Sequence, residues 1–299
     1  MSRLLWGIDL GGTKIEGVIL DEQGSALQRL RRETGGAQGY DHVVAQIIGV
    51  VRDLENASGL PCPDVIGIGT PGVVEAATFA LKNSNTTCLN GRPLREDLTA
   101  ALGREVRMAN DANCFALAEA SWGAAAGAEV VMGLILGTGV GGGIVVRRKI
   151  LRGLHGITGE WGHNPLRGEF HPCYCGREGC IETVISGTSL QRYYRETGGE
   201  DIRLPEIVAR ARTGELLAAT TIRRLQEKFG EAIAAVINIL DPNVIVIGGG
   251  VGNIEELYSE ETRECIRRFL FNPVLATQIL RPQLGDSAGV FGAAILGRD

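Results

Sequence analysis

Short apolar runs separated by turns predict a mixed α/β fold. Residues 3–10 and 14–20 are strand-length apolar runs joined by a glycine turn, which is typical of an antiparallel pair. Helical periodicity follows at 41–56, a continuous apolar strand is expected at 64–72, and another strand is expected at 105–109. Because strands and helices alternate, the chain is expected to form α/β sheets with helices packed on them.

The same pattern occurs twice. A strand, a turn of glycine and threonine, and a returning strand lie at 4–20 and again at 131–147. This repeat predicts two similar α/β domains, with the final helix, which opens near Asp286, returning to the first domain. The expected domains are residues 1–110 plus 287–299 and residues 111–286.

The second half is expected to differ from the first by a polar insertion. The remaining elements read from the pattern are a helix at 111–122, strands at 129–136 and 143–147, a cysteine-rich insertion at 152–182, helices from about 188 and at 215–239, a strand at 243–250 and a helix near 254–270.

The amino-acid composition favours a globular protein and disfavours nucleic-acid-binding, membrane-spanning and secreted proteins. Apolar residues make up 44% and charged residues 22% of 299, which is ordinary for a globular chain. The net charge of −5 disfavours nucleic acid as a partner. No apolar run is long enough to cross a membrane, and the first one ends at Asp9, too early for a signal peptide. We therefore expect a cytoplasmic protein.

Glycine is the exception, with 43 residues clustered after apolar runs. The cluster at 137–143 has five glycines in seven positions, more than a tight turn needs, which indicates close approach of a ligand. A strand follows it, so the helix that a dinucleotide fingerprint requires is missing. Gly11 and Gly12, between Asp9 and Lys14, form either a plain hairpin turn or an anion site. With a third cluster at 248–250, these loops predict a nucleotide site.

Two further groups carry chemistry. Asn110 and Asp111 stand where a helix begins, either as its N-cap or as a base that accepts a proton from a sugar hydroxyl during phosphoryl transfer. The cysteines of the insertion have the spacing of a Cys₃His zinc site, namely Cys173, Cys175 and Cys180. Their spacing leaves His163 and His171 open as the fourth ligand.

Together these motifs resemble the ROK family of sugar kinases and transcriptional repressors. The resemblance runs from residue 9 to 294 and rests on DLGGTK, GTPG, NDANC, LGTGVGGG, GEWGH, CYCGREGCIE and IVIGGG, in this order. Within it, KNSNTTCLNGRPL and GEWGHNPL are similar to fructokinases or mannofructokinases, whereas NDANCFALAEA and LILGTGVGGG are also close to N-acetylglucosamine kinases.

The resemblance implies the actin-like ATPase fold of hexokinase, with two α/β domains around a cleft, and Asp111 as the catalytic base. The implied contacts to ATP and Mg²⁺ are Asp9, Gly11, Gly12, Thr13, Lys14, Gly137, Thr138, Gly139, Gly249 and Gly250. The implied sugar contacts are Gly72, Asn85, Asn110, Asp111, Glu160, His163 and Glu182. For structural Zn²⁺ it favours His163 over His171.

The expected function is therefore an active, ATP-dependent hexose kinase. We expect fructose as the substrate, with mannose as a second one, and keep N-acetylglucosamine or glucose as the alternative. Repressors of the family carry a DNA-binding domain before the first glycine motif, and here Asp9 arrives almost at once. A sugar-binding sensor without catalytic activity remains the alternative outside the enzymes. Because members of the family are commonly dimers, the resemblance implies a homodimer.

Overall fold

The computed structural model describes residues 4–75, 78 and 80–298. These residues form two compact units. Among the described residues, unit 1 comprises those within 4–126, 148–158 and 283–298, and unit 2 comprises Gly127–Arg147 and Gly159–Pro282. No helix in the described part of the chain has both the length and the apolar character needed to span a bilayer.

Unit 1 is built on a five-stranded sheet. Its strand order is β3 (Ala26–Glu33), β2 (Lys14–Leu20), β1 (Leu5–Leu10), β4 (Val65–Thr70) and β7 (Glu105–Asn110). β1 pairs antiparallel with β2, as the pattern predicted, while β4 runs parallel to both β1 and β7. The sheet is therefore mixed, with the antiparallel hairpin on one side of the parallel strands.

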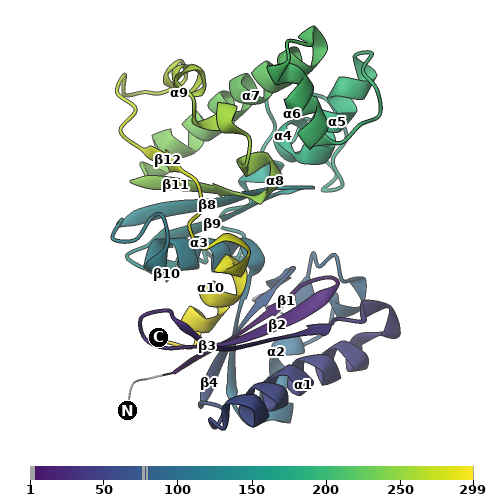
Figure 1. Cartoon of the computed structure of the whole chain (residues 1–299), viewed down its shortest axis with the longest axis vertical. Helices are drawn as coiled ribbons and strands as arrows, with labels where there is room; N and C mark the ends of the chain where they lie inside the picture. Colours follow the sequence, from purple (N-terminus) through teal and green to yellow (C-terminus); the bar gives the residue numbers. More distant parts are fainter. Residues whose placement is uncertain (1–3, 76–77, 79, 299) are drawn as a thin grey trace. The chain divides into compact units, whose positions relative to one another are not determined.

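Helices cover both faces of this sheet (Figure 1). Trp6, Ile8 and Leu10 of β1 are buried in one apolar cluster with α1 (Tyr40–Ser58), and Leu5 lies in another cluster with α10 (Ala288–Leu296). Because successive strand residues point to opposite faces, α1 and α10 lie on opposite sides of the sheet. The final helix thus returns to the first sheet, as expected.

Unit 2 repeats the strand plan of unit 1 around a larger helix. Its strands lie in the order β9 (Val140–Val146), β8 (Val130–Leu136), β11 (Val244–Gly248) and β12 (Gln278–Leu280). β8 and β9 are antiparallel, and β11 is parallel to both β8 and β12. The order matches β2, β1, β4 and β7 of unit 1, so the predicted internal repeat is confirmed.

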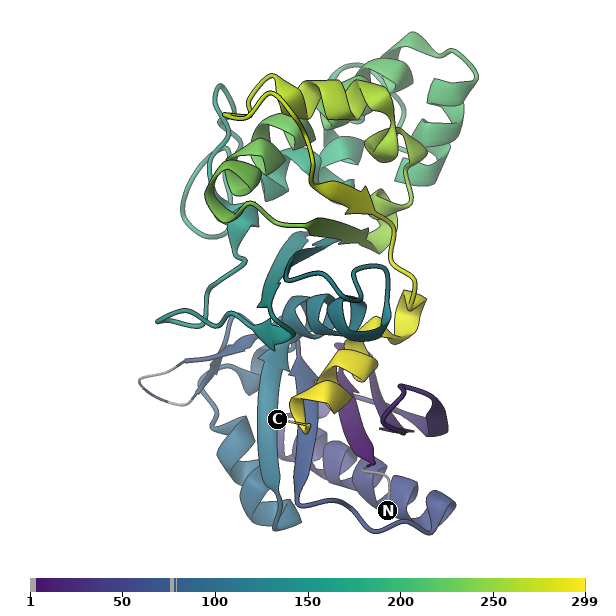
Figure 2. The ribbon, with the colours of Figure 1, turned by 90° about the vertical axis from the view of Figure 1, so that its left-hand side faces the viewer.

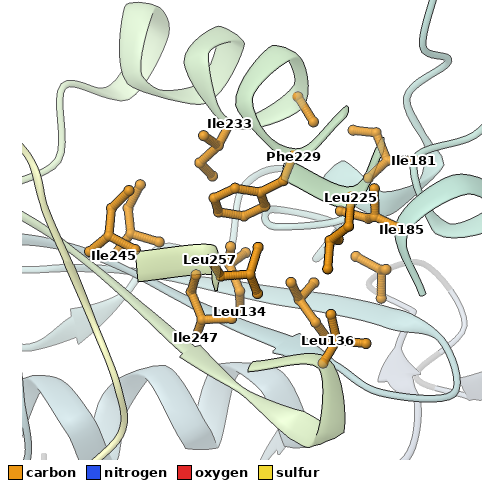
Figure 3. Packing of buried hydrophobic residues seen from close by; sticks show 14 of the residues in the cluster. Leu134, Leu136, Ile181, Ile185, Leu225, Phe229, Ile233, Ile245, Ile247 and Leu257 are labelled. Carbon is orange, nitrogen blue, oxygen red and sulfur yellow. The ribbon is translucent and has the colours of Figure 1, made fainter. Parts of the chain in front are cut away.

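The core of unit 2 lies between this sheet and α7 (Leu216–Leu240), seen close by in Figure 3. Leu225, Phe229 and Ile233 of the helix meet Leu134 and Ile247 of the strands, and all five are fully buried. A fully buried Phe or Leu contributes roughly 1.5 to 3 kcal/mol relative to exposure. This packing gives unit 2 a rigid sheet from which its loops project.

The remaining elements are short. The other helices are α2 (Leu94–Leu102), α3 (Asp111–Trp122), α4 (Glu182–Ile185), α5 (Gly187–Glu196), α6 (Leu204–Arg212), α8 (Gly249–Gly252) and α9 (Glu260–Arg267). The other strands are β5 (Val73–Val74), β6 (Leu81–Lys82) and β10 (Lys149–Ile150). Single 3₁₀ turns lie at Gly36–Gln38, Thr87–Leu89, Trp161–His163, Glu255–Tyr258 and Gly285–Ser287. Figure 2 shows the same ribbon turned by 90°.

Several boundaries differ from the sequence-based expectation. The strand expected at 143–147 begins at Val140, because the glycines after it already pair with β8. The single helix expected near 254–270 is divided, since Ser259 caps α9 by accepting a hydrogen bond from the Thr262 N–H. The expected domain boundary near residue 110 also differs from the division into units, because α3 packs on α10 and stays in unit 1.

Candidate active site

Asp9 stands at the end of β1, beside the glycine turn of unit 1. Its side chain is half-buried, and burial raises the pKa of this carboxyl from 3.8 to about 6, with the charges of Asp111 and Glu16 adding to the shift and Lys14 opposing it. The Asp111 contribution shows that the two carboxylates lie within electrostatic range in unit 1. Asp9 is thus a carboxylate that a neighbouring cation would stabilise in its charged form.

Asp111 is the first residue of α3. Asn110 is the N-cap, because its side chain accepts a hydrogen bond from the Asn113 N–H at 2.8 Å. The Asp111 Oδ1 accepts one from the Ala112 N–H at 2.8 Å. Although the Asp111 side chain reaches solvent, desolvation by the surrounding protein raises its pKa, and the backbone hydrogen bonds partly oppose this shift. Desolvation therefore outweighs the stabilisation that the backbone N–H groups give to the Asp111 carboxylate.

The turn from Gly11 to Lys14 is exposed and tightly closed. The Gly11 N–H donates to the Lys14 carbonyl at 2.9 Å, and the Thr34 hydroxyl donates to the Gly11 carbonyl at 2.7 Å. Gly12, Thr13 and Lys14 are open to solvent. A Cβ on Gly12 would lie 3.8 Å from the Asn85 Oδ1. The structure therefore brings the predicted sugar residue Asn85 to the predicted phosphate turn.

Gly72, another predicted sugar contact, is a packing residue in this structure. It is buried, and a Cβ there would lie 2.5 Å from the Lys82 carbonyl oxygen. Its own carbonyl accepts a hydrogen bond from the Thr70 hydroxyl at 2.9 Å. A larger residue would push the 82–84 stretch, which leads to Asn85, away from β4.

The two glycine loops of unit 2 border one cavity of about 650 Å³. Gly137, Thr138 and Gly250 line it, and a Cβ on either of these two glycines would meet open space. Gly249 has a φ of +82° and packs against the Leu136 carbonyl, where a Cβ would come within 2.4 Å. Gly250 therefore faces the cavity, whereas Gly249 shapes the turn between β11 and α8.

The cysteine cluster gathers as the spacing predicted. The ligand atoms of His163, Cys173, Cys175 and Cys180 all lie within 4.8 Å of one another. The His163 Nδ1 is 3.5 Å from the Cys173 Sγ, and the Cys175 and Cys180 Sγ atoms are 3.6 Å apart. Ligands about 2.3 Å from a tetrahedral zinc ion are roughly 3.7 Å apart, so the donor set fits this metal. His171 is exposed and is not one of the four grouped residues.

The other ring nitrogen of His163 faces polar groups. Its Nε2 lies 2.9 Å from the Tyr174 hydroxyl and 4.0 Å from the Glu160 Oε2. The two rings meet edge to face, with centroids 5.1 Å apart. Sequence reasoning missed Tyr174, whose one signal is its place between two cysteines. The predicted sugar residues Glu160 and His163 are thus brought together within unit 2.

Glu182 opens α4 two residues after Cys180. Its Oε2 accepts a hydrogen bond from the Val140 N–H at 2.9 Å, at the end of the glycine loop 137–140. Sequence reasoning placed Glu182 among the sugar contacts and did not anticipate its bond to this loop. No periodic pattern signals such a contact, because it depends on the fold of the insertion.

Comparisons with known proteins agree with this geometry. A family model described as the ROK family matches residues 5–299. The N-acetyl-D-glucosamine kinase of Photobacterium profundum is 37% identical over 98% of this chain and 99% of its own length.

Two solved structures are similar over nearly the whole chain. A ROK hexokinase from Thermus thermophilus is 32% identical with a TM-score of 0.89, covering 99% of this chain and 98% of its own. A ROK family glucokinase from Streptomyces griseus, solved with glucose and AMPPNP, is 30% identical with a TM-score of 0.78 and covers 99% of both chains. These similarities and the repeated sheet confirm the expected actin-like ATPase fold. The chain belongs to the ROK family.

Proposed function

We propose that this protein is an ATP-dependent sugar kinase that uses Asp111 as its general base. The observation that carries the proposal is the pair of interacting carboxylates, Asp9 and Asp111, in the unit that also carries the exposed turn Gly11–Lys14. Carboxylates with raised pKa values beside an anion-binding turn are suited to phosphoryl transfer, where one group takes a proton and another meets the metal.

For the substrate, we propose N-acetylglucosamine. Fructose was the expectation from the sequence, but the curated relative at 37% identity is named for N-acetyl-D-glucosamine and aligns over nearly its whole length. The S. griseus enzyme was solved with glucose, a ring of the same configuration. Both relatives favour the alternative in which the sugar is glucose-like, so fructose becomes a comparison substrate in the test.

In the proposed reaction Asp111 accepts the proton of the attacking hydroxyl. The sugar oxygen forms a bond to the γ-phosphorus, and the bond from that phosphorus to the bridging oxygen breaks, which releases ADP. In a loose transition state the proton moves late, so the base needs position more than high basicity. The raised pKa of Asp111 nevertheless improves it as an acceptor.

Unit 1 also carries the groups proposed for the phosphates and Mg²⁺. Exposed backbone N–H groups at Gly12 and Thr13, with the Lys14 ammonium, would contact phosphate oxygens. Asp9 would hold Mg²⁺, whose charge offsets that of the transferring phosphoryl group. Unit 2 would bind the adenosine in the 650 Å³ cavity beside Gly250.

A structural zinc ion fits the four donors of unit 2. Bound there, it would close residues 163–180 of the insertion into one loop and deprotonate the thiols. With its Nδ1 facing the metal, His163 would present its Nε2 beside Glu160. In the structure this nitrogen lies 2.9 Å from the Tyr174 hydroxyl. A sugar hydroxyl is the proposed partner in the complex.

The test is sugar-dependent ADP release from Mg-ATP by the zinc-loaded protein. N-acetylglucosamine, glucose, mannose and fructose are compared, with Asp111→Asn as the control. We expect N-acetylglucosamine to lead and the variant to lose roughly 10²-fold or more in kcat. Turnover led by fructose would refute the substrate assignment alone. No turnover with any sugar would favour a sensor over a kinase.

A further inference from the structure

The glycine loop of unit 2 is supported by the segment that follows the cysteine cluster. Three hydrogen bonds join them: Val140 N–H to Glu182 Oε2 at 2.9 Å, Gly187 N–H to the Gly137 carbonyl at 2.7 Å, and the Thr188 hydroxyl to the Thr138 carbonyl at 2.8 Å. The loop is thus held along its whole length, from Gly137 to Val140. The supporting residues all lie between 182 and 188.

Of these three hydrogen bonds, only the one from the Val140 N–H has a charged acceptor, the Glu182 carboxylate. A backbone N–H bonded to a carboxylate makes a stronger hydrogen bond than one bonded to a neutral oxygen. The same Oε2 occupies space beside Gly139, where an added Cβ would lie 2.6 Å from it. Glycine at 139 therefore leaves room for the carboxylate at 182, and an added methyl group would displace that carboxylate.

The supported loop forms one wall of the proposed nucleotide site. Gly137 and Thr138 line the 650 Å³ cavity, and Thr188 of the supporting segment lines it too. We propose that Glu182 is a positioning residue for the nucleotide: its carboxylate holds the 137–140 loop in the conformation that binds ATP. This inference rests on the proposed function, since it assumes that the cavity takes the nucleotide.

The physical reason is the freedom of a glycine-rich backbone. A loop with several glycines populates many conformations, and ordering it costs free energy at the moment a ligand binds. A bond made before the ligand arrives reduces that cost. Without Glu182 the Val140 N–H loses its acceptor, the competent conformation is less populated, and the apparent nucleotide affinity falls in proportion.

Calorimetric titration with Mg-AMPPNP, in the absence of sugar, tests this role. We expect Glu182→Ala to bind roughly tenfold more weakly than wild type, because it loses a hydrogen bond to a charged group. Glu182→Gln keeps an oxygen that can accept from Val140, so its affinity should stay within about threefold of wild type. Glu178→Ala, an exposed carboxylate in the same insertion, is the matched control and should not change binding.

A role for Glu182 in sugar binding alone predicts a different result. In that case Glu182→Ala would bind AMPPNP as well as wild type, and the inference would be overturned while the proposed function stood. If wild type itself bound no nucleotide, the proposed function would fail as well. All variants are compared at equal zinc content and with their thermal unfolding recorded, so that a folding defect is recognised.

A second variant separates support of the loop from direct contact with the nucleotide. In wild type, Gly139→Ala should weaken AMPPNP binding, because the new methyl group displaces the carboxylate. In the Glu182→Ala background the same change should cost little, since no carboxylate is left to displace. Equal losses in both backgrounds would mean that the methyl group meets the nucleotide itself, and would contradict the proposal.

Discussion

Asp9 illustrates how burying a single carboxylate can reduce the stability of the ligand-free protein. It stands half-buried at the end of β1, and burial, with smaller contributions from the charges of Asp111 and Glu16, raises its pKa to about 6. Near neutral pH it is therefore mostly ionised in an environment that disfavours its charge. A bound cation would relieve this unfavourable environment, which is consistent with the proposed Mg²⁺ contact.

Asp9→Asn should stabilise the ligand-free protein near neutral pH. The folded pKa of about 6 exceeds the unfolded value of 3.8, so between these values the folded state binds more protons. The contribution of Asp9 to the free energy of unfolding of wild type is therefore fully present below pH 3.8 and is lost as pH rises through 6, a decrease of about 2 to 3 kcal/mol. Asparagine does not ionise, so the variant avoids this decrease.

Urea unfolding at pH 4 and pH 7.5 checks this expectation. The variant should exceed wild type at pH 7.5, the difference should shrink toward pH 4, and Mg-AMPPNP binding should be weaker in the variant. A variant less stable than wild type at both pH values would show that Asp9 makes structural contacts that outweigh its charge.

Tyr174 is the second residue whose role emerges from the structure. Its hydroxyl contacts the His163 Nε2, opposite the Nδ1 that faces the thiols. A partner on the far nitrogen of a metal-binding histidine fixes the ring orientation, and losing such a partner typically costs 10- to 100-fold in metal affinity. We expect Tyr174→Phe to lower zinc affinity by about tenfold in a chelator competition. Phe170→Leu, at another exposed aromatic residue of the insertion, is the control and should retain wild-type affinity.

At the scale of elements, glycines set how closely α10 approaches the sheet of unit 1. A Cβ on Gly67 of β4 would lie 1.7 Å from the Ala293 carbonyl oxygen. Because this oxygen belongs to the backbone, the clash can be relieved only by moving α10 or the strand. Gly67→Ala should therefore push α10 off the sheet and destabilise the protein by about 3 kcal/mol or more. The unfolding temperature of this variant is compared with that of a control, Ala101→Ser, at an exposed position of α2. An unchanged unfolding temperature would show that α10 is not rigidly seated.

Glu119 explains why unit 1 extends past residue 110, the boundary expected from the sequence. Its fully buried carboxylate accepts backbone hydrogen bonds from Ala124, Gln283 and Leu284. These bonds tie the end of α3 to the stretch that leads into α10, which is distant in sequence. The residue looks like any other glutamate of a helix in the one-dimensional pattern, so its role in holding unit 1 together could not be predicted.

The elements themselves were largely predictable because they carry a hydrophobic period. The apolar runs around 4–20 and 131–147 predicted both hairpins, and the repeat predicted two sheets of one plan. The 152–182 insertion has no period, so the contacts of Tyr174 and Glu182 were not predicted. Its cysteine cluster was predicted nevertheless, because the spacing of cysteines that suits a metal site can be recognised without a secondary-structure pattern.

Across the whole molecule, one strand plan serves two chemical roles. The penultimate residue of β1 is Asp9, whereas that of β8 is Ile135, so the charged group belongs to unit 1 alone at this position. Unit 2 instead carries a glycine loop beside a cavity and the cysteine cluster. The repeat thus provides two similar scaffolds, and the loops at the strand ends make them different.

Removal of zinc should therefore affect unit 2 and spare unit 1. Cys180 lies two residues before Glu182, and Glu182 holds the 137–140 loop, so loosening the cluster is expected to loosen the loop as well. Hydrogen exchange measured by mass spectrometry, before and after chelation, should show faster exchange at 161–190 and at 137–140. The strands of unit 1 should keep their rates and act as the internal control. Faster exchange at 161–180 with an unchanged 137–140 loop would show that the loop is held without the cysteine cluster, by Gly187 and Thr188.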